Sequence, residues 1–372
     1  MWDDGTWQPL PPLVGDTAAD VCVIGLGASG LCAVIEAASL GLKVVGIDST
    51  RTAGGAAGAN GGILRAGVSR FHHDAVQSFG RTRAVALYKL TAGEIARMVE
   101  ETPDAVRRTG SLRVAAGDAE WAECETQLSA LRADGVAVEH RDTPFGRGIF
   151  IPSDAAVQPL VRGRSLALQA IACGARLFEQ THALGFTGNE VRTPGGRIRC
   201  GSVVVAVDGG LEDTVPALVG VVRTTRLQML ATEPAPNVQI PCPVSANGGF
   251  DYWQQLPNGR IALGGGRNRA FEDEWGAPAA PSDAIQHYLD SVLRDRIRTS
   301  ARVTHRWAAR VAYTESGLPV LAEVAPNVWA TGGYNGTGNL LGALCGRAAA
   351  RLACGQASEL ASLLAQPAGA AC

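Results

Sequence analysis

Three glycines and one acid near the N-terminus have the types and spacing of a dinucleotide-binding turn. Gly25, Gly27 and Gly30 follow a short apolar run and open an amphipathic helical segment. Gly25 permits a tight turn, Gly27 lets backbone approach a pyrophosphate, and Gly30 lets the helix pack on the strands. The pyrophosphate would lie on the helix N-terminus, and Asp48 would accept a hydrogen bond from a ribose hydroxyl, which disfavours a 2′-phosphate. The pattern therefore predicts a dinucleotide site.

Two further glycine-rich stretches fit the same ligand. The first, RTAGGAAGANGGILRAG at 51–67, runs directly into Ile63 and Leu64, whereas flexible linkers usually carry Ser, Pro or charges. We expect its backbone to lie close to a large flat group. The second, GGYNGTGN at 332–339, precedes a helical segment and repeats the anion-binding arrangement of the first turn.

Composition excludes several classes of protein. The 372 residues carry 33 Lys and Arg against 35 Asp and Glu, so the net charge of −2 gives no footprint for nucleic acid or an anionic membrane. No apolar run is long enough to span a bilayer, and the acidic, proline-rich start does not resemble a signal peptide. Nine scattered cysteines without metal-type spacing favour reduced thiols and no metal site. We expect a cytoplasmic location.

The order of the elements predicts an α/β protein with two domains. The continuous apolar run VVVAVDGG at 203–210 is typical of a parallel strand buried on both faces, and its glycines permit another approach to a nucleotide. From 226 to 266 alternating residues flank a Pro-Asn-Gly turn, which predicts an antiparallel sheet. We expect a Rossmann-type FAD-binding domain from 1–75, 150–225 and 315–372, and an α+β substrate-binding domain on a mostly antiparallel sheet from 76–149 and 226–314. Helices are expected at 84–101 and 121–131, and a strand near 136–139.

In combination, the motifs resemble the D-amino acid oxidase family of FAD enzymes nearly end to end. This family contains glycine oxidase, monomeric sarcosine oxidase and gamma-glutamylputrescine oxidase. The motifs are VIGLGASG with Asp48, GANGG at 58–62, the VVVAVDGG strand, YWQQLPNGRIALGGG at 252–266, TESGLPVL, and NVWATGGYNGTGN. Together they are specific for the family and less so for any one substrate.

The resemblance implies an extended FAD, with adenosine near Gly25 to Asp48 and the flavin ring between the domains. The loop at 333–339 would lie near the pyrimidine edge of the ring, where amides stabilise negative charge on a reduced flavin. The cofactor contacts that it implies are Gly25, Gly27, Ala28, Ser29, Gly30, Asp48, Ser49, Asn60, Gly61, Gly62, Ala183, Ala206, Gly333, Tyr334, Asn335, Gly336, Thr337 and Gly338.

Departures from the family pattern are equally informative. The arginine that anchors a carboxylate in glycine oxidase and the cysteine that tethers flavin in sarcosine oxidase both align with Val311, so FAD is expected to be noncovalent. The neighbouring Arg310 could replace that arginine only if the strand shifts by one residue. The two lysines of sarcosine oxidase near the flavin align with Leu340 and Ala262. Fast reaction with oxygen is therefore in doubt.

The remaining candidates for the catalytic site are Tyr252, Tyr313, Arg65 and Arg310. The two tyrosines would clamp an apolar amine beside the flavin, and either could instead be a half-buried strand residue. Arg65 could contact substrate or flavin, or lie solvated on the surface. His72 and His73 beside Asp74 suggest a general-base pair, but adjacent residues on a helix do not face one another, so FHHDA is expected to cap the following helix. The segment 267–282, rich in charge, Gly and Pro, suggests a lid.

We therefore predict an FAD-dependent enzyme that oxidises a C–N bond of a small amine or amino acid to an imine by hydride transfer. Oxygen or another acceptor would take the electrons. Two alternatives stay open: a glycine or D-amino acid oxidase with an arginine carboxylate anchor, and the flavoprotein subunit of a dehydrogenase that uses another acceptor. Both an oligomer and a hetero-subunit arrangement are compatible with the sequence. Loss of the anchoring arginine favours amines.

Overall fold

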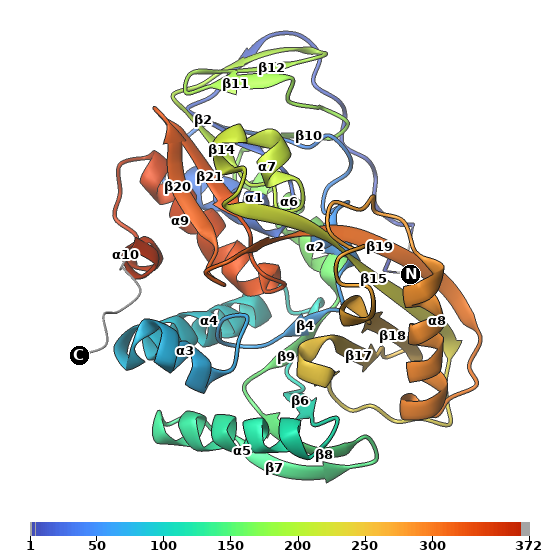
Figure 1. Cartoon of the computed structure of the whole chain (residues 1–372). Helices are drawn as coiled ribbons and strands as arrows, with labels where there is room; N and C mark the ends of the chain where they lie inside the picture. Colours follow the sequence, from blue (N-terminus) through green and yellow to red (C-terminus); the bar gives the residue numbers. More distant parts are fainter. Residues whose placement is uncertain (1, 4, 366–372) are drawn as a thin grey trace.

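A six-stranded sheet organises one part of the molecule. The computed structural model describes residues 2, 3 and 5–365 (Figure 1). Neighbouring strands of this sheet are parallel except for the last, which is antiparallel to β21. Their order is β10 (Arg176–Phe178), β3 (Val44–Ile47), β2 (Val21–Ile24), β14 (Ser202–Val205), β21 (Val328–Gly332) and β20 (Val320–Ala325).

Both faces of this sheet are covered, which explains its continuous apolar runs. Val21 and Val23 belong to one core cluster, with residues of three helices, whereas Cys22 and Ile24 belong to another. The second cluster includes residues of a small sheet, which is drawn at the top of Figure 1. The helices are α1 (Ala28–Ser39), α6 (Pro159–Ala172) and α9 (Ala343–Ala353); the small sheet has the order β1 (Thr17–Ala18), β13 (Gly196–Arg199), β12 (Glu190–Thr193) and β11 (Gly185–Thr187).

An eight-stranded sheet forms the other part, and all of its neighbouring pairs are antiparallel except β16 with β6. The helix α8 (Asp283–Ser291) and the π-helical turn at Val292–Ile297 contribute to its core with Trp253 and Leu263. The strands are β19 (Val303–Thr314), β15 (Val222–Pro234), β18 (Arg260–Gly265), β17 (Asp251–Gln255), β16 (Val244–Ala246), β6 (Ser111–Val114), β8 (Gly146–Ile151) and β7 (Glu139–Thr143). The fold class expected from the sequence is confirmed.

Further helices and a small sheet connect the two larger sheets. The expected helix at 84–101 is α4 (Arg81–Glu101) and that at 121–131 is α5 (Asp118–Ala133), whereas the strand expected near 136–139 was misplaced and begins only at Glu139. The other elements are α2 (Ala56–Ala59), α3 (His72–Phe79), α7 (Leu211–Thr214), α10 (Glu359–Ala365), and the sheet β4 (Ile63–Leu64), β9 (Ala155–Val157) and β5 (Val106–Arg107). In the part of the chain that the structure describes, no helix is both long and apolar enough to cross a membrane.

A buried ion-pair cluster joins α9 to α4. Arg347 Nη2 donates to Glu94 Oε1 at 3.2 Å and to Glu101 Oε1 at 3.0 Å. Burial raises the pKa of Glu94, and the neighbouring Arg347 opposes that effect. Because α9 follows directly on the loop at 333–338, this cluster fixes the helix that carries the loop.

Replacing Arg347 with Met should lower the free energy of unfolding by about 3 kcal/mol or more, because it leaves the buried Glu94 without its ion-pair partner. Urea denaturation followed by circular dichroism would measure the change. The matched control is Arg97→Met, which removes an exposed ion-pair partner of Glu101. It should lower the free energy of unfolding by less than about 1 kcal/mol. Equal losses in the two variants would contradict this account of the cluster.

Candidate functional site

The glycine turn after β2 leaves room for a ligand at one of its three glycines. Gly25 has φ +101°, and a methyl group on it would lie 2.7 Å from the Ala206 carbonyl oxygen. A methyl on Gly30 would lie only 1.7 Å from the Gly25 carbonyl oxygen. A methyl on Gly27 would meet only the Ala57 side chain, at 3.4 Å. The fold itself therefore requires Gly25 and Gly30, whereas the open space at Gly27 fits a closely approaching pyrophosphate.

The N-terminus of α1 is free to bind an anion. Gly27 is its N-cap, no side chain caps it, and its first turn, with Ala28 and Ser29, holds no acid. The positive end of the helix is therefore not neutralised locally. The Ser29 hydroxyl donates to the Ala206 carbonyl at 3.3 Å and so ties this turn to the end of β14. The residues fit the phosphates of a dinucleotide.

Asp48 fixes the shape of the same turn. Its Oδ2 accepts from Leu26 N and its Oδ1 from Thr50 N, both at 2.8 Å. A carboxylate has further lone pairs for a ribose hydroxyl. Ser49 is exposed beside it, and Ala183 is half-buried against the core on the far side of the sheet.

The glycine stretch at 58–62 and the C-terminal loop are fastened to each other. Asn60 Nδ2 donates to Asn339 Oδ1 at 3.2 Å, and Asn339 Nδ2 donates back to Asn60 Oδ1 at 3.1 Å. Asn60 Oδ1 also accepts from Gly62 N at 2.8 Å. Asn339 was missed in the sequence, since nothing local marks it as a partner of a residue so distant in the chain.

Asp208 holds the loop at 333–338 in place. Its carboxylate accepts from Gly333 N at 2.9 Å, Tyr334 N at 3.2 Å and Ala312 N at 3.2 Å. Burial raises the pKa of Asp208 to about 6. Sequence reasoning missed this residue, although an acid that ends a buried strand was a usable signal. The glycine after it does not approach a nucleotide: a methyl on Gly209 would lie 2.3 Å from the Arg310 carbonyl oxygen.

Within that loop, most of the expected cofactor residues have structural partners. Asn335, at φ +54°, accepts from Thr314 N at 2.9 Å and donates to the Gly333 carbonyl at 2.7 Å. Tyr334 is buried, with its hydroxyl 3.2 Å from Thr331 Oγ1. Thr337 Oγ1 donates to the Tyr334 carbonyl. These contacts shape the loop, and its most exposed residue is Gly336, whose backbone is therefore accessible to a ligand.

One side of the eight-stranded sheet faces these loops, and we call it the site face. Directly opposed residues on neighbouring strands project to the same side of a sheet. A row of such residues crosses the sheet and defines the site face: Arg113, Ser245, Tyr252, Gly264, Met229 and Trp307.

Two side chains of the site face bind the glycine stretch directly. Trp307 Nε1 donates to the Ala59 carbonyl at 2.7 Å. Gln254 Nε2 donates to the carbonyls of Gly61 and Gly62 at 2.7 and 2.9 Å. The site face and the cofactor loops therefore form the two walls of one site.

The structure brings Tyr252 and Tyr313 to this site. A methyl on Gly61 would lie 2.8 Å from the Tyr252 ring, and one on Gly336 would lie 3.4 Å from the Tyr313 hydroxyl. Val311 and Tyr313 alternate along β19 with Trp307, so they share the site face. Burial raises the pKa of both tyrosines. Each hydroxyl therefore stays neutral and can donate a hydrogen bond.

The two arginines singled out in the sequence lie in different places. Arg65 Nη1 donates to Ser245 Oγ on the site face at 2.9 Å, and burial lowers its pKa. Arg310 projects from the opposite face of β19, where it pairs with Asp213 at 2.8 Å. A strand shift by one residue would be needed to turn it inward, and β19 pairs with β15 in continuous register across Arg310. The structure does not bring Arg310 to the site.

A third arginine, missed in the sequence, lies beside Tyr313. Arg267 is 7% exposed, and its guanidinium carbon is 4.5 Å from the centre of the Tyr313 ring. Arg267 belongs to the segment 267–282, for which the sequence suggests a lid. Arg226 holds this segment against β15, because its Nε and Nη2 donate to Glu274 at 2.7 Å each.

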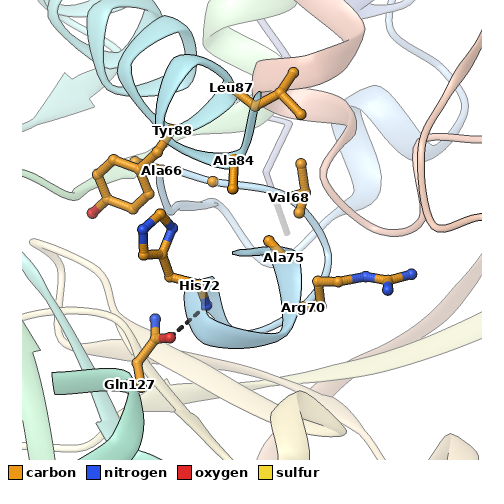
Figure 2. A pocket seen from close by; sticks show the side chains of 10 residues that line it. Ala66, Val68, Arg70, His72, Ala75, Ala84, Leu87, Tyr88 and Gln127 are labelled. Carbon is orange, nitrogen blue, oxygen red and sulfur yellow. Dashed lines mark hydrogen bonds between the residues drawn. The ribbon is translucent and has the colours of Figure 1, made fainter. Parts of the chain in front are cut away.

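His72 and His73 bind carboxylates outside the row that defines the site face. His72 begins α3 with its Nε2 2.7 Å from Asp134 Oδ2, and His73 Nε2 lies 3.1 Å from Glu123. The expected helix cap is absent, since the N-cap of α3 is Phe71 without a side-chain bond. Figure 2 shows His72 beside a cavity of about 20 Å³, enough for one water. The described residues contain no cluster of three or more metal-binding side chains.

A known family combines this fold with this arrangement of loops. The family model for FAD dependent oxidoreductases matches residues 20–352, so the chain belongs to that family. The resemblance seen in the sequence, the FAD cofactor and the assignment as an oxidoreductase are confirmed.

Similar proteins cover nearly the whole chain. A probable oxidoreductase OrdL of Rhizobium meliloti is 27% identical over 95% of this chain and 87% of its own length. The gamma-glutamylputrescine oxidoreductase of Escherichia coli is 27% identical over 95% and 88%. The structure of glycine oxidase from Geobacillus kaustophilus has a TM-score of 0.75 at 19% identity, covering 95% of this chain and 99% of that one. The structure of L-proline dehydrogenase from P. horikoshii has a TM-score of 0.77 at 20% identity, covering 93% of this chain and 95% of that one. These structures share the fold.

Replacing Gly27 with Ala should weaken FAD binding about tenfold or more, by displacing a hydrogen-bonded phosphate. The unfolding temperature of the FAD-free protein should not change, because the new methyl meets no protein atom closer than 3.4 Å. Fluorescence titration with FAD measures the affinity. Gly93→Ala in α4, where a methyl has open space, is the control. Unchanged affinity in Gly27→Ala would refute the assignment of the turn.

Proposed function

We propose that this protein oxidises a C–N bond of a small amine or amino acid to an imine at the site face. The observation that carries the proposal is the position of Tyr252 and Tyr313 on one wall, against Gly61 and Gly336 of the cofactor loops. The relatives named for glycine, proline and gamma-glutamylputrescine chemistry support the same class of bond.

FAD, when bound, would accept the hydride from the carbon next to nitrogen. As the hydride leaves, the nitrogen lone pair of the neutral amine forms the C=N bond, and the resulting iminium loses a proton to water to give the imine. The chain provides orientation and a dry site. The two tyrosine rings form an aromatic wall that positions a flat or apolar substrate and excludes water. Neither hydroxyl ionises near neutral pH, so neither removes a proton as a tyrosinate. The imine is then hydrolysed by water.

We also propose that FAD is held without a covalent bond. Val311 occupies the site face where a tethering cysteine would stand, and it is nearly buried between the strands. The Cys345 thiol, in α9, is fully buried, and burial raises its pKa to about 12. A buried neutral thiol is a poor nucleophile.

The domain boundaries, the cytoplasmic location and reduced cysteines stay predictions. The segments assigned to the FAD-binding domain supply every strand of the six-stranded sheet, which supports that division. Residues 1, 4 and 366–372 of the predicted FAD-binding domain, including Cys372, lie outside the described residues.

Anaerobic addition of substrate should bleach the flavin absorbance of the purified protein. We expect reduction by members of a panel of amines, sarcosine, glycine, proline and D-amino acids, and none by hydroxy acids of the same shape, because an alcohol lacks the nitrogen lone pair. Absorbance near the flavin maximum measures it. Bleaching by hydroxy acids but by no amine or amino acid would contradict the proposed function.

The electron acceptor is the least constrained part of the reaction. Ala262 is fully buried on the site face in a cluster with Trp2 and Met229. The sequence has only two lysines, Lys43 and Lys89, and both are exposed outside this site. No lysine therefore supplies positive charge for reducing oxygen there.

The reduced protein should accordingly react with air about tenfold or more slowly than with a soluble quinone, since no lysine stabilises reduced oxygen at the site. Stopped-flow mixing of photoreduced protein with each acceptor gives both rates. Free reduced flavin serves as the reference for uncatalysed reaction with oxygen. Reoxidation by air as fast as by quinone would show that oxygen needs no lysine here.

A further inference from the structure

We propose that Arg267 binds a carboxylate of the substrate, so that the preferred substrate is an amino acid rather than a carboxylate-free amine. The inference rests on the proposed function and names the substrate class of the same site. It also assigns the anchoring role to the loop after β18 instead of to β19, where Val311 and Arg310 do not provide it.

The guanidinium lies among three aromatic rings, one of which belongs to the site face. Its central carbon is 4.3 Å from the centre of the Trp275 ring, 4.4 Å from Phe271 and 4.5 Å from Tyr313. Tyr313 is the residue whose hydroxyl faces Gly336 of the cofactor loop. Arg267 therefore contacts one of the two tyrosines of the site face.

Two of its hydrogen-bond donors are unused. Arg267 Nε and Nη2 are buried and have no hydrogen-bond partner among the described residues. The nearby Glu274 favours the charge of Arg267 only through space, because both of its oxygens already accept hydrogen bonds from Arg226 and Gln228 Nε2. A buried cation without a counter-ion is strongly unfavourable. The ring faces offset part of this through cation–π attraction, and an anion would supply the rest.

The surrounding charge favours an anion as well. Arg223 also contacts Trp275, with its guanidinium carbon 4.2 Å from the ring centre. Its carboxylate neighbour, Glu272, is mostly exposed and 3.9 Å away. Desolvation is the largest influence on Arg267 and lowers its pKa, which lies so far above neutrality that the group stays charged. A guanidinium with free Nε and Nη2 presents the two donors that bind a carboxylate bidentately.

The backbone around Arg267 is fixed, so the site is preorganised. The segment continues from β18 along the edge of β15, where Arg226 N donates to the Glu274 carbonyl at 2.8 Å and Gly276 N donates to the Thr224 carbonyl at 2.9 Å. Trp275 pairs with Thr225 as an isolated antiparallel bridge. A rigid donor pair loses little entropy when it binds.

The two arginines singled out in the sequence are less suited to this role. Arg310 pairs with Asp213 on the opposite face. Arg65 donates to Ser245 and lies within the field of the buried Asp154. Of these three, Arg267 is the one that combines burial, contact with a site tyrosine and unpartnered donors.

The test uses the FAD-loaded protein and measures binding of benzoate, an unreactive carboxylate, by the perturbation of flavin absorbance. Benzamide, its neutral counterpart, is titrated in parallel. In Arg267→Met, the Kd for benzoate should rise about tenfold to a hundredfold, the loss of one charge-assisted bidentate pair, while the Kd for benzamide stays within a factor of about two. Arg267→Lys keeps the positive charge but loses the paired donors of the guanidinium. Its Kd for benzoate should therefore lie between those of the parent protein and Arg267→Met.

The matched control is Arg269→Met. Arg269 is in the same short turn, is exposed, and stacks over Tyr288 of α8, 4.6 Å from the ring centre. Its replacement should leave the Kd for benzoate unchanged. The unfolding temperature gives a second readout. The unfolding temperature of Arg267→Met should equal or exceed that of the parent protein, because the substitution removes an unpaired buried charge.

Each result bears on the proposal. Unchanged benzoate affinity in both Arg267 variants would overturn it, as would a large drop in unfolding temperature together with equal loss of benzoate and benzamide binding, which is the signature of a structural role. Flavin reduction by carboxylate-free amines alone would also overturn it while leaving C–N oxidation intact. Benzoate binding that depends on Arg267, without reduction by any amine or amino acid, would retain the carboxylate site and reject the proposed function.

Discussion

The site depends on the way the eight-stranded sheet is held against the glycine stretch at 58–62. Trp307 and Gln254 donate three hydrogen bonds to the carbonyls of Ala59, Gly61 and Gly62. Ala59 ends the short helix α2, and Gly61 and Gly62 lie in the irregular backbone between α2 and β4, where the Gly62 carbonyl also accepts from Val157 N. The bonds therefore satisfy buried acceptors and at the same time fix the spacing between the two walls. Without them the tyrosines of the site face would have no fixed position relative to the cofactor loops.

Charge inside the site is distributed unevenly. Carboxylates close to the site already have hydrogen-bond donors: Glu274 accepts from Arg226, and Asp208 accepts from three backbone amides. Cations are less fully matched, since burial and the neighbouring Arg65 lower the pKa of Arg113 to about 10, and Arg267 has free donors. An interior with unmatched positive charge is stabilised by an anionic ligand. This physical asymmetry favours an acidic substrate, although the sequence alone had favoured amines.

The parts of the fold that are locally encoded were predictable from the sequence. The turn from Gly25 to Gly30 and the strands around it follow from the backbone requirements of single glycines and from apolar runs buried on both faces. The contributions of Arg267, Asp208 and Asn339 were not predictable, because each depends on a partner distant in the chain. Arg310 shows the same limit: strand alternation makes it or Val311 face the site, and only the pairing of β19 with β15 decides which. Composition was a poor guide as well. It suggested a lid at 267–282, a segment rich in charge and Gly, but gave no sign of the buried ion pair between Arg226 and Glu274 that holds this segment.

The most direct test of the account is a crystal structure of the protein with FAD and benzoate bound. We predict that the flavin ring lies between the glycine stretch at 58–62 and the site face, next to Tyr252 and Tyr313, with the benzoate carboxylate on Arg267. A flavin ring located away from the site face, or benzoate bound to another cation while Arg267 stays unpaired, would contradict it.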